Sequence, residues 1–274
     1  MTEADYQFLS AFLRARSGMV LNSDGHYLAK SRLPAVCRRF GLSDPVEVIA
    51  ILRTGAHPEI ESAVVEAMVI QETFFFRDKA LFAQIHDTVL PRLMDARAST
   101  RRLRIWSAAA STGQEAYSIA MMLAGLAQRL DGWTVDIMAT DLSEVALERG
   151  RKGLYTHFEV QRGLPIQMLL KHFTQVGDLW QINADLTSTV NFSCMNLLDD
   201  FSALGTFDLI LCRNVLMYLD DRAKRDVLER VVARLAKDGN LILGGVETPL
   251  GLSEDVVADA GLKGIYCRAD CRHA

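Results

Sequence analysis

The alternation of apolar runs with helix-like segments after residue 103 limits the fold of this chain more than any other feature. Five apolar runs are typical of buried strands, at residues 103–106, 134–141, 190–196, 207–214 and 240–245. Helical periodicity fills three of the intervals, at 115–130, 142–152 and 221–237. Strands that alternate with helices predict an α/β fold, in which helices cover both faces of a parallel sheet.

Two regions depart from this alternation. Residues 1–70 carry helical patterns, one of them after a helix-start signal at residues 43–45, and predict an all-α N-terminal domain. Residues 171–193 alternate apolar and polar side chains around a turn at 177–178, which predicts an inserted antiparallel hairpin. We therefore expect a helical domain over 1–70, a linker over 71–90 and the α/β domain over 91–274.

Composition narrows the class of protein. Of the 274 residues, 50% are hydrophobic and 23% are charged, which is ordinary for a globular protein. The net charge of −4 argues against general binding to nucleic acids. We expect no membrane insertion, because no apolar run approaches the roughly 18–20 residues of a transmembrane helix. The acidic, polar N-terminus does not resemble a secretory signal.

Five cysteines, an odd number, favour a reducing cytoplasm as the compartment. Cys37, Cys194 and Cys212 stand in apolar surroundings and are expected to be small buried side chains. Cys267, Cys271 and His273 lie close together near the C-terminus, but a structural zinc site needs four ligands at defined spacings. We predict a terminal strand at Gly264–Cys267 with a frayed tail, and no metal site.

The segment 103–118 reads as a strand, a loop of small residues and a helix, and such a loop is where ligands bind in a parallel sheet. A dinucleotide site needs G-x-G-x-x-G at this point, whereas the loop A-A-A-S-T-G has one glycine, which argues against NAD or FAD. Glu115 places a carboxylate in the first helical turn, where a phosphate would prefer bare N–H groups. A cationic ligand is favoured, and S-adenosylmethionine carries a sulfonium and an ammonium.

Polar residues end four of the predicted strands, at Ser107, Asp141, Asn196 and Asn214. In a doubly wound sheet these ends converge on one crevice. Asp141 is placed to accept hydrogen bonds from ribose hydroxyls. The alternative is that Asp141 only caps the helix that follows it.

The segment Q-E-T-F-F-F-R-D, residues 71–78, joins the two predicted domains. Thr73 and Arg77 are four residues apart and would share a face of a helical turn. An arginine beside apolar residues costs free energy unless it meets an anion. Either Arg77 pairs structurally with Asp78 or Glu72, or it faces the crevice.

The phenylalanines of this segment and Trp106 are expected either in the core or at the crevice. Phe74 and Phe75 are expected in the core. Phe74, Phe76 and Trp106 are candidates for an apolar wall that excludes water from the crevice.

Five motifs stand in order along the chain: Q-E-T-F-F-F-R-D, R-I-W-S-A-A-A-S-T-G-Q-E-A-Y-S-I-A-M, A-T-D-L, C-M-N-L-L and F-D-L-I-L-C-R-N-V-L-M-Y-L. Together they resemble the CheR family, the chemoreceptor glutamate methyltransferases of bacterial chemotaxis, over about residues 5 to 266. The resemblance implies a Rossmann-like class I methyltransferase domain with a small antiparallel β-subdomain, preceded by an all-α domain. It also implies methyl transfer from S-adenosyl-L-methionine to glutamate side chains on the cytoplasmic helices of chemoreceptors, leaving S-adenosyl-L-homocysteine.

The resemblance carries over to individual residues of this chain. Tyr218 matches the family tyrosine on the substrate side, and Arg77 and Tyr218 would orient the substrate carboxylate. Glu115 would bind the methionine ammonium. Many members have Asn where this chain has Gln71. The cofactor contacts would fall on Gln71, Thr73, Arg77, Glu115, Asp141, Asn196, Leu197, Asn214 and Val215.

Substrate docking is expected on the helical domain. The stretch 25–43 contains Lys30, Arg32, Arg38 and Arg39 and no acidic residue. It is either an ordinary solvated basic face or a docking surface for acidic receptor helices. Family members that tether to a receptor pentapeptide have a longer, glycine-rich loop in the β-subdomain. The short turn Q-V-G-D here predicts pentapeptide independence.

Two alternative functions would use the same crevice. A methyltransferase for small molecules would have no use for the basic helical domain. A non-catalytic sensor of S-adenosylmethionine or S-adenosylhomocysteine would not need Arg77 and Tyr218 beside an intact cofactor site. We expect a monomer that acts on receptor helices in the cytoplasm.

Overall fold

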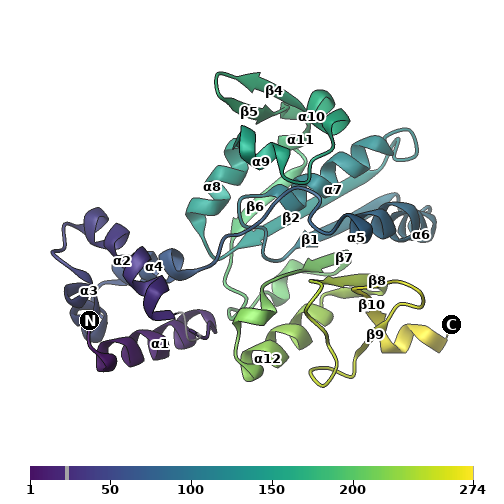
Figure 1. Ribbon diagram of the computed structural model, residues 1–274. Helices are drawn as coiled ribbons and strands as arrows, with labels where there is room; N and C mark the ends of the chain where they lie inside the picture. The colour runs from purple at the N-terminus through teal and green to yellow at the C-terminus, as the bar shows by residue number, and fades with distance from the viewer. Residues whose placement is uncertain (22–24, 274) are drawn as a thin grey trace. The chain divides into compact units, whose positions relative to one another are not determined.

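The computed structural model describes residues 1–21 and 25–273, with side chains through Cys271. It divides into two compact units (Figure 1). The first contains Met1–Ile70 together with the short segment Tyr218–Lys224. The second contains Gln71–Met217 and Arg225–Ala274. The first unit is therefore built from two stretches that are far apart in the sequence.

The first unit is helical, as the sequence predicts. Its helices are α1 (Glu3–Ser17), α2 (Gly25–Phe40), α3 (Pro45–Thr54) and α4 (Pro58–Met68). The helix-start signal at residues 43–45 precedes a helix, as predicted. The Asp44 carboxylate caps α3 by accepting hydrogen bonds from the Val46 and Glu47 amides. The helices pack through fully buried side chains such as Leu13, Leu33 and Met68.

The second unit contains a seven-stranded sheet in the order β6-β2-β1-β7-β8-β10-β9. The first five strands of this order are mutually parallel, and β10 runs antiparallel to β8 and β9. The predicted α/β class is confirmed. The strands are β1 (Arg102–Ser107), β2 (Thr134–Asp141), β6 (Val190–Cys194), β7 (Phe207–Cys212), β8 (Leu235–Leu243), β9 (Val256–Ala258) and β10 (Ile265–Arg268).

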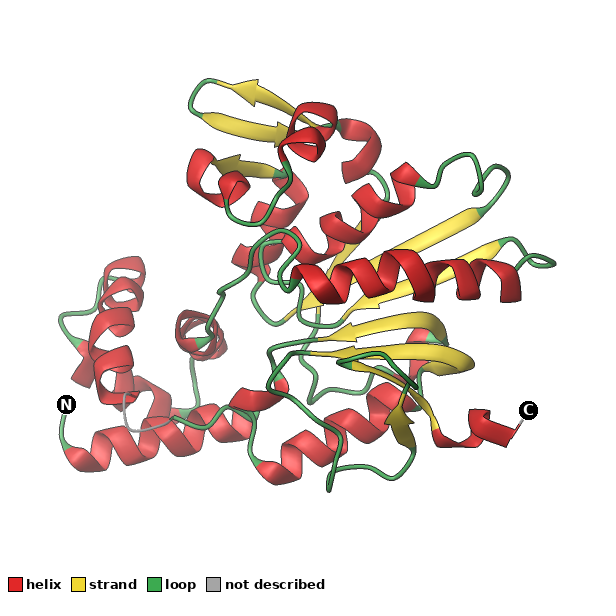
Figure 2. Ribbon diagram, turned by 45° about the vertical axis from the view of Figure 1, so that its right-hand side comes forward, coloured by secondary structure: helices red, strands yellow, loops and turns green. Residues whose placement is uncertain are grey.

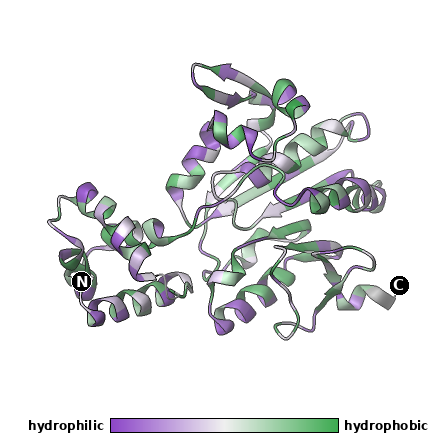
Figure 3. Ribbon diagram, viewed as in Figure 1, coloured by the Kyte–Doolittle hydropathy of each residue, from purple (hydrophilic) through white to green (hydrophobic). Residues whose placement is uncertain are grey.

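Helices flank this sheet (Figure 2). They are α5 (Lys79–Gln84), the π-helix η1 (Ile85–Val89), α6 (Leu90–Ala96), α7 (Gln114–Gly125), α8 (Glu144–Lys152) and α12 (Asp221–Val232). Every residue of β7 is buried, and Figure 3 shows this central strand as strongly hydrophobic. Short 3-10 turns follow at η2 (Ser202–Leu204), η3 (Leu216–Tyr218) and η4 (Ala269–His273).

The boundary between α12 and β8 differs from the sequence-based expectation. The helix expected to reach residue 237 ends at Val232, and the last parallel strand begins at Leu235 rather than at 240. The register between β7 and β8 shifts here, from the pair Phe207–Leu235 to the pair Leu209–Asn240. The early part of β8 is irregular, so its local pattern resembled a continuing helix.

A separate three-stranded antiparallel sheet has the order β3-β5-β4. The predicted hairpin is present as β4 (Phe173–Val176) and β5 (Leu179–Ile182). The predicted extent of the insertion is wrong at both ends, because β3 (Leu154–Thr156) joins the sheet and residues 190–193 belong to β6. Three residues are too few to show strand periodicity. The remaining helices of this subdomain are α9 (His157–Gln161), α10 (Ile166–His172) and α11 (Ala184–Thr187).

Trp106 lies in the core and does not line the crevice, contrary to expectation. It is fully buried, its ring packs against Phe201 and Phe207 at centroid distances of 5.3 and 5.4 Å, and its indole N–H donates to Thr140 Oγ1 at 2.9 Å. Its place inside the sheet leaves it no free face for a reaction site.

The consecutive phenylalanines also differ from the prediction. Phe75 and Phe76 are buried, whereas Phe74 is partly exposed. The Phe75 ring packs against the subdomain rings of Tyr155 and Phe173 at 5.1 and 5.6 Å. Phe75 therefore joins the core of the α/β unit to that of the β-subdomain.

Two of the three cysteines expected to be buried are so, Cys37 and Cys212, but Cys194 is exposed. It is the last residue of β6, an edge strand of the large sheet. The side chain of His273 lies outside the described residues, and those described form no group of three potential metal ligands. Within the described ranges, none of the helices combines the length and apolar character needed to cross a bilayer.

A buried hydrogen bond ties the subdomain to the loop after β1. The Tyr155 hydroxyl donates to the Thr112 carbonyl at 2.7 Å, and the Tyr155 side chain is fully buried. Tyr155→Phe should lower the free energy of unfolding by about 1 kcal/mol, because it leaves a buried acceptor unpaired. Urea unfolding measures this, with Tyr27→Phe, at a 78% exposed position, as the control. Equal stability of the two variants would contradict the structural role of this bond.

Candidate functional site

The loop after β1 is fixed between the two neighbouring strands. The Ala108 amide donates to the Leu211 carbonyl at 2.8 Å, and the Ala110 amide donates to the Thr140 carbonyl at 2.9 Å. The loop then turns through Gly113, which has a φ of 93°. A Cβ atom there would approach the Phe192 ring to 3.0 Å. The small residues of this loop thus hold its backbone at the carboxyl edge of the parallel strands.

Asp141 ends β2 and faces this loop. Its Oδ2 accepts from the Ser111 amide at 2.8 Å, and its Oδ1 accepts from the Ser143 amide at 2.9 Å and from Gln71 Nε2 at 3.1 Å. Burial raises the pKa of this carboxyl group, and the hydrogen bonds oppose the shift only in part. The cap of α8 is Ser143, which accepts from the Ala146 amide. Asp141 therefore links Gln71 to Ser111 in the loop after β1. Its task goes beyond capping the helix that follows it.

Gln71 is bound to both sides of this junction. Its carbonyl accepts from the Ser111 hydroxyl at 3.1 Å, and its side-chain N–H group donates to Asp141. Its Oε1 atom is buried and has no hydrogen-bond partner within the part of the chain that the structure describes. A buried acceptor of this kind is costly unless a ligand or water supplies a donor.

Glu115, the predicted ammonium ligand, lies beside a buried arginine that sequence reasoning missed. Its Oε1 accepts from the Ser107 hydroxyl and its Oε2 from Arg213, both at 2.8 Å. Arg213 also pairs with Asp78 and donates to the Arg77 carbonyl at 3.0 Å. Two carboxylates around one guanidinium leave a formal charge of −1, which suits a cation. A charged residue directly after the apolar run of β7 was the available signal.

Asn214 and Val215 are held by another missed residue, Glu247, which is 8% exposed. Its Oε2 accepts from the Asn214 amide at 2.7 Å and its Oε1 from the Val215 amide at 3.0 Å. Asn214 has a φ of 56°, an uncommon backbone conformation for a residue with a side chain. The Glu247 carboxylate, which comes shortly after β8, stabilises this turn through these two hydrogen bonds.

Asn196 and Leu197 follow β6, which pairs with β2. The Met195 amide donates to the Asp141 carbonyl at 2.9 Å, so the chain leaves β6 close to that residue. The Asn196 side chain accepts from the Leu198 amide at 3.0 Å, and Leu197 is buried. The strand ends of Ser107, Asp141, Asn196 and Asn214 thus share one edge of the sheet, as predicted.

Residues 73 and 74 are irregular and residues 75–78 form a turn, so the predicted helical face shared by Thr73 and Arg77 is wrong. Positive φ values of 50° at Phe76 and 70° at Asp78 break helical geometry. The Phe76 amide instead donates to the Ser118 hydroxyl at 2.9 Å. Thr73 is partly buried just before this turn.

Arg77 does not form the ion pair offered as its structural alternative. Its guanidinium donates to the Glu72 carbonyl at 3.0 Å and lies 5.6 Å from the Phe74 ring centroid. Asp78 pairs with Arg213, and the Glu72 carboxylate pairs with Arg162. Among the described side chains, no carboxylate lies within ion-pair distance of Arg77.

Tyr218 and the four basic residues belong to the first unit. Arg32 is partly buried and donates to the Ala67 and Val69 carbonyls at 3.0 and 2.5 Å, where α4 ends. These bonds give Arg32 a structural task. Lys30, Arg38 and Arg39 are exposed on α2, and Arg39 lies 3.8 Å from Glu66. Tyr218 is half-buried, and its carbonyl accepts from the Val20 amide.

Comparisons with known proteins identify the family of this chain. Residues 71–257 match the family model "CheR methyltransferase, SAM binding domain". The chain is 36% identical over 257 residues to a chemotaxis protein methyltransferase of Vibrio parahaemolyticus, covering 93% of this chain and 92% of the relative. It is 38% identical to chemotaxis protein methyltransferase 1 of Pseudomonas aeruginosa, with 89% and 90% coverage, and 32% identical to the Escherichia coli relative, with 90% and 85% coverage. The chain therefore belongs to the CheR methyltransferase family and carries its S-adenosylmethionine-binding domain.

Proposed function

We propose that this enzyme transfers the methyl group of S-adenosylmethionine to glutamate side chains on the cytoplasmic helices of chemoreceptors. The proposal rests on one observation, that the Arg77 guanidinium has no carboxylate partner among the described side chains. Two other arginines near it, Arg213 and Arg162, each pair with a carboxylate. Within the described ranges, the Arg77 guanidinium donates only to a backbone carbonyl. Its guanidinium is available to bind a carboxylate bidentately. The names of the relatives support a chemotaxis substrate.

The residues present fit S-adenosylmethionine. The cluster of Glu115, Asp78 and Arg213 has one negative charge in excess, which suits the methionine ammonium. Asp141 and the unpartnered Oε1 of Gln71 are acceptors suited to hydroxyl or amino donors of the adenosine. When bound, the cofactor supplies an electrophilic methyl group on a sulfonium.

No general base is required of the chain. A glutamate carboxylate has an ordinary pKa of about 4.3 and is already ionised at neutral pH. The task of the protein is to hold that carboxylate in line with the methyl group, and positioning of this kind can supply up to roughly 7–11 kcal/mol. We assign this orientation to Arg77, with one further hydrogen bond from Tyr218.

One assay separates this function from its alternatives. Methyl-labelled cofactor is incubated with receptor-bearing membranes, and alkali-labile label on the receptor is expected. A small-molecule methyltransferase or a cofactor sensor would leave the receptor unlabelled. We further propose a cytoplasmic monomer that needs no receptor pentapeptide. Tight binding of the free pentapeptide in a titration would overturn that last point.

Asp141 should make cofactor binding depend on pH. Its ionised form is the better acceptor for hydroxyl donors, so affinity is full above its raised pKa and falls as the pH drops through it. Asp141→Asn should weaken binding of S-adenosylhomocysteine by roughly tenfold or more and remove this pH dependence. Calorimetric titration between acidic and neutral pH measures both effects.

Asp136→Asn is the matched control, because Asp136 lies on the same strand away from its carboxyl end and pairs with Arg104. The control should retain both the affinity and its pH dependence. An Asp141 variant that behaves as the control does would exclude the proposed contact.

Arg77→Ala should abolish most turnover, because the substrate carboxylate loses its bidentate partner, with a loss of roughly 100-fold or more. Arg77→Lys keeps the charge but not the planar fork and should recover only part of the rate. Tyr218→Phe, which removes a single hydrogen bond, should cost less. Initial rates and unfolding curves are measured together, and a folded Arg77→Ala enzyme with normal activity would refute the assignment.

The exposed arginines of α2 should contribute to receptor recognition. Reversing charge at both Arg38 and Arg39 to Glu should raise the KM for receptor and leave the affinity for S-adenosylhomocysteine unchanged, because charge complementarity acts on the encounter. Arg102→Glu, at the exposed amino end of β1, is the control. If the double variant and the control behave alike, the basic surface is an ordinary solvated face.

A further inference from the structure

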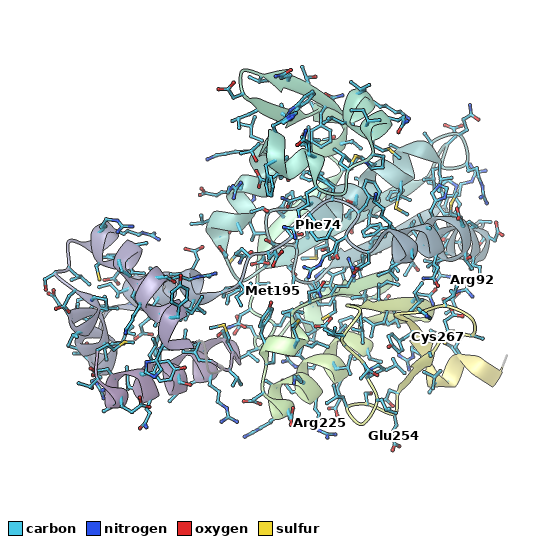
Figure 4. The ribbon with its side chains drawn as sticks, viewed as in Figure 1. Phe74, Arg92, Met195, Arg225, Glu254 and Cys267 are labelled. Atoms are coloured by element: carbon cyan, nitrogen blue, oxygen red, sulfur yellow. The ribbon has the colours of Figure 1, made fainter. Side chains whose placement is uncertain are left out.

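Two guanidinium groups share one aromatic ring beside the proposed substrate site. The Cζ of Arg162 lies 4.3 Å and that of Arg77 lies 5.6 Å from the centroid of Phe74, which Figure 4 labels. Because both distances end at the same centroid, the two Cζ atoms are at most about 10 Å apart. Glu72 serves both arginines. Its carbonyl accepts from Arg77 at 3.0 Å, and its carboxylate accepts from Arg162 at 2.7 Å.

The backbone at Arg162 is held by contacts other than the ion pair of its side chain. The next residue, Gly163, has a φ of 87°, and a Cβ atom there would approach the Phe75 carbonyl oxygen to 2.0 Å. Leu164 follows and is buried in the same hydrophobic core as Phe75. Close backbone packing and a buried side chain therefore hold this segment against residues 74–75.

The Glu72–Arg162 pair is easily opened. The two side chains are 58% and 42% exposed, so water already screens their attraction, and exposed pairs of this kind contribute little to stability. The Arg213 side chain, by contrast, is 1% exposed, so opening its ion pairs would leave a buried charge without a partner. A carboxylate from another molecule could replace that of Glu72 on Arg162 without uncovering a buried charge.

We propose that Arg162 is a second substrate-binding arginine, which takes an acidic side chain of the receptor segment while Arg77 takes the glutamate to be methylated. Glu72 occupies Arg162 until the substrate arrives. Residues three or four apart on a helix have Cβ atoms about 5–6 Å apart, and two such carboxylates can reach two guanidiniums at this spacing. The proposal rests on the function proposed above, and it names the charge pattern of the substrate.

Variants on the two sides of the ion pair should act in opposite directions. Arg162→Ala should raise the KM for a receptor cytoplasmic fragment roughly tenfold, with kcat and cofactor affinity nearly unchanged. Glu72→Gln removes the competitor and should lower that KM, by about two- to fivefold. In the Arg162→Ala background, Glu72→Gln should have no further effect on KM.

A purely structural pair would give a different pattern, because removing either partner would then have the same effect. Arg151→Ala and Glu144→Gln are matched controls from a similarly exposed pair on α8, and neither should change the KM. Unchanged KM in Arg162→Ala, or equal rises in Arg162→Ala and Glu72→Gln, would overturn the proposal.

Direct binding of the receptor fragment in the presence of S-adenosylhomocysteine separates this proposal from the proposed function. Opposite shifts in Kd for Arg162→Ala and Glu72→Gln support the second carboxylate site even if the wild-type enzyme transfers no methyl group. Methyl transfer to receptor without such shifts supports the function and refutes the role of Arg162.

Discussion

The buried guanidinium of Arg213 is the interaction on which the rest of the site depends. A charge with 1% exposure of its side chain is stable only with close partners, and here Glu115, Asp78 and the Arg77 carbonyl provide them. These groups come from the end of β7, the start of α7 and the turn before α5. One ion network thus fixes the turn that carries Arg77 to the first turn of α7.

Glu247 performs a similar task on the other side of β7. Its carboxylate accepts four backbone N–H groups, from Asn214, Val215, Met217 and Gly244. Gly244 is required beside it, because a Cβ atom there would approach Glu247 Oε2 to 2.6 Å. One acidic side chain therefore holds two strand-end turns together.

The strands and the strand-end residues could be predicted because they depend on local patterns. Apolar runs located all five parallel strands. The carboxyl ends of parallel strands share one edge of the sheet, and this rule predicted that Asp141 and Asn214 lie at the site. Arg213 and Glu247 could not be assigned tasks, since their partners lie far away in the sequence, 33 residues in the case of the Glu247–Asn214 contact. The turn at Phe76 and Asp78 was missed because positive φ values leave no periodic signal. Trp106 was misplaced because burial depends on rings such as Phe201, which another segment supplies.

The discontinuity of the first unit has a consequence for the newly made chain. Helices α1 to α4 are synthesised before the second unit, but Tyr218–Lys224 is synthesised only after most of that unit. That late segment supplies the Tyr218 carbonyl to the Val20 amide, the Asp220 amide to the Gly18 carbonyl, and the Asp220 carboxylate to Arg14. The helical unit must wait for residue 224 before its last backbone bonds close. Vectorial synthesis therefore links completion of the N-terminal unit to the production of four of the five parallel strands, β1, β2, β6 and β7.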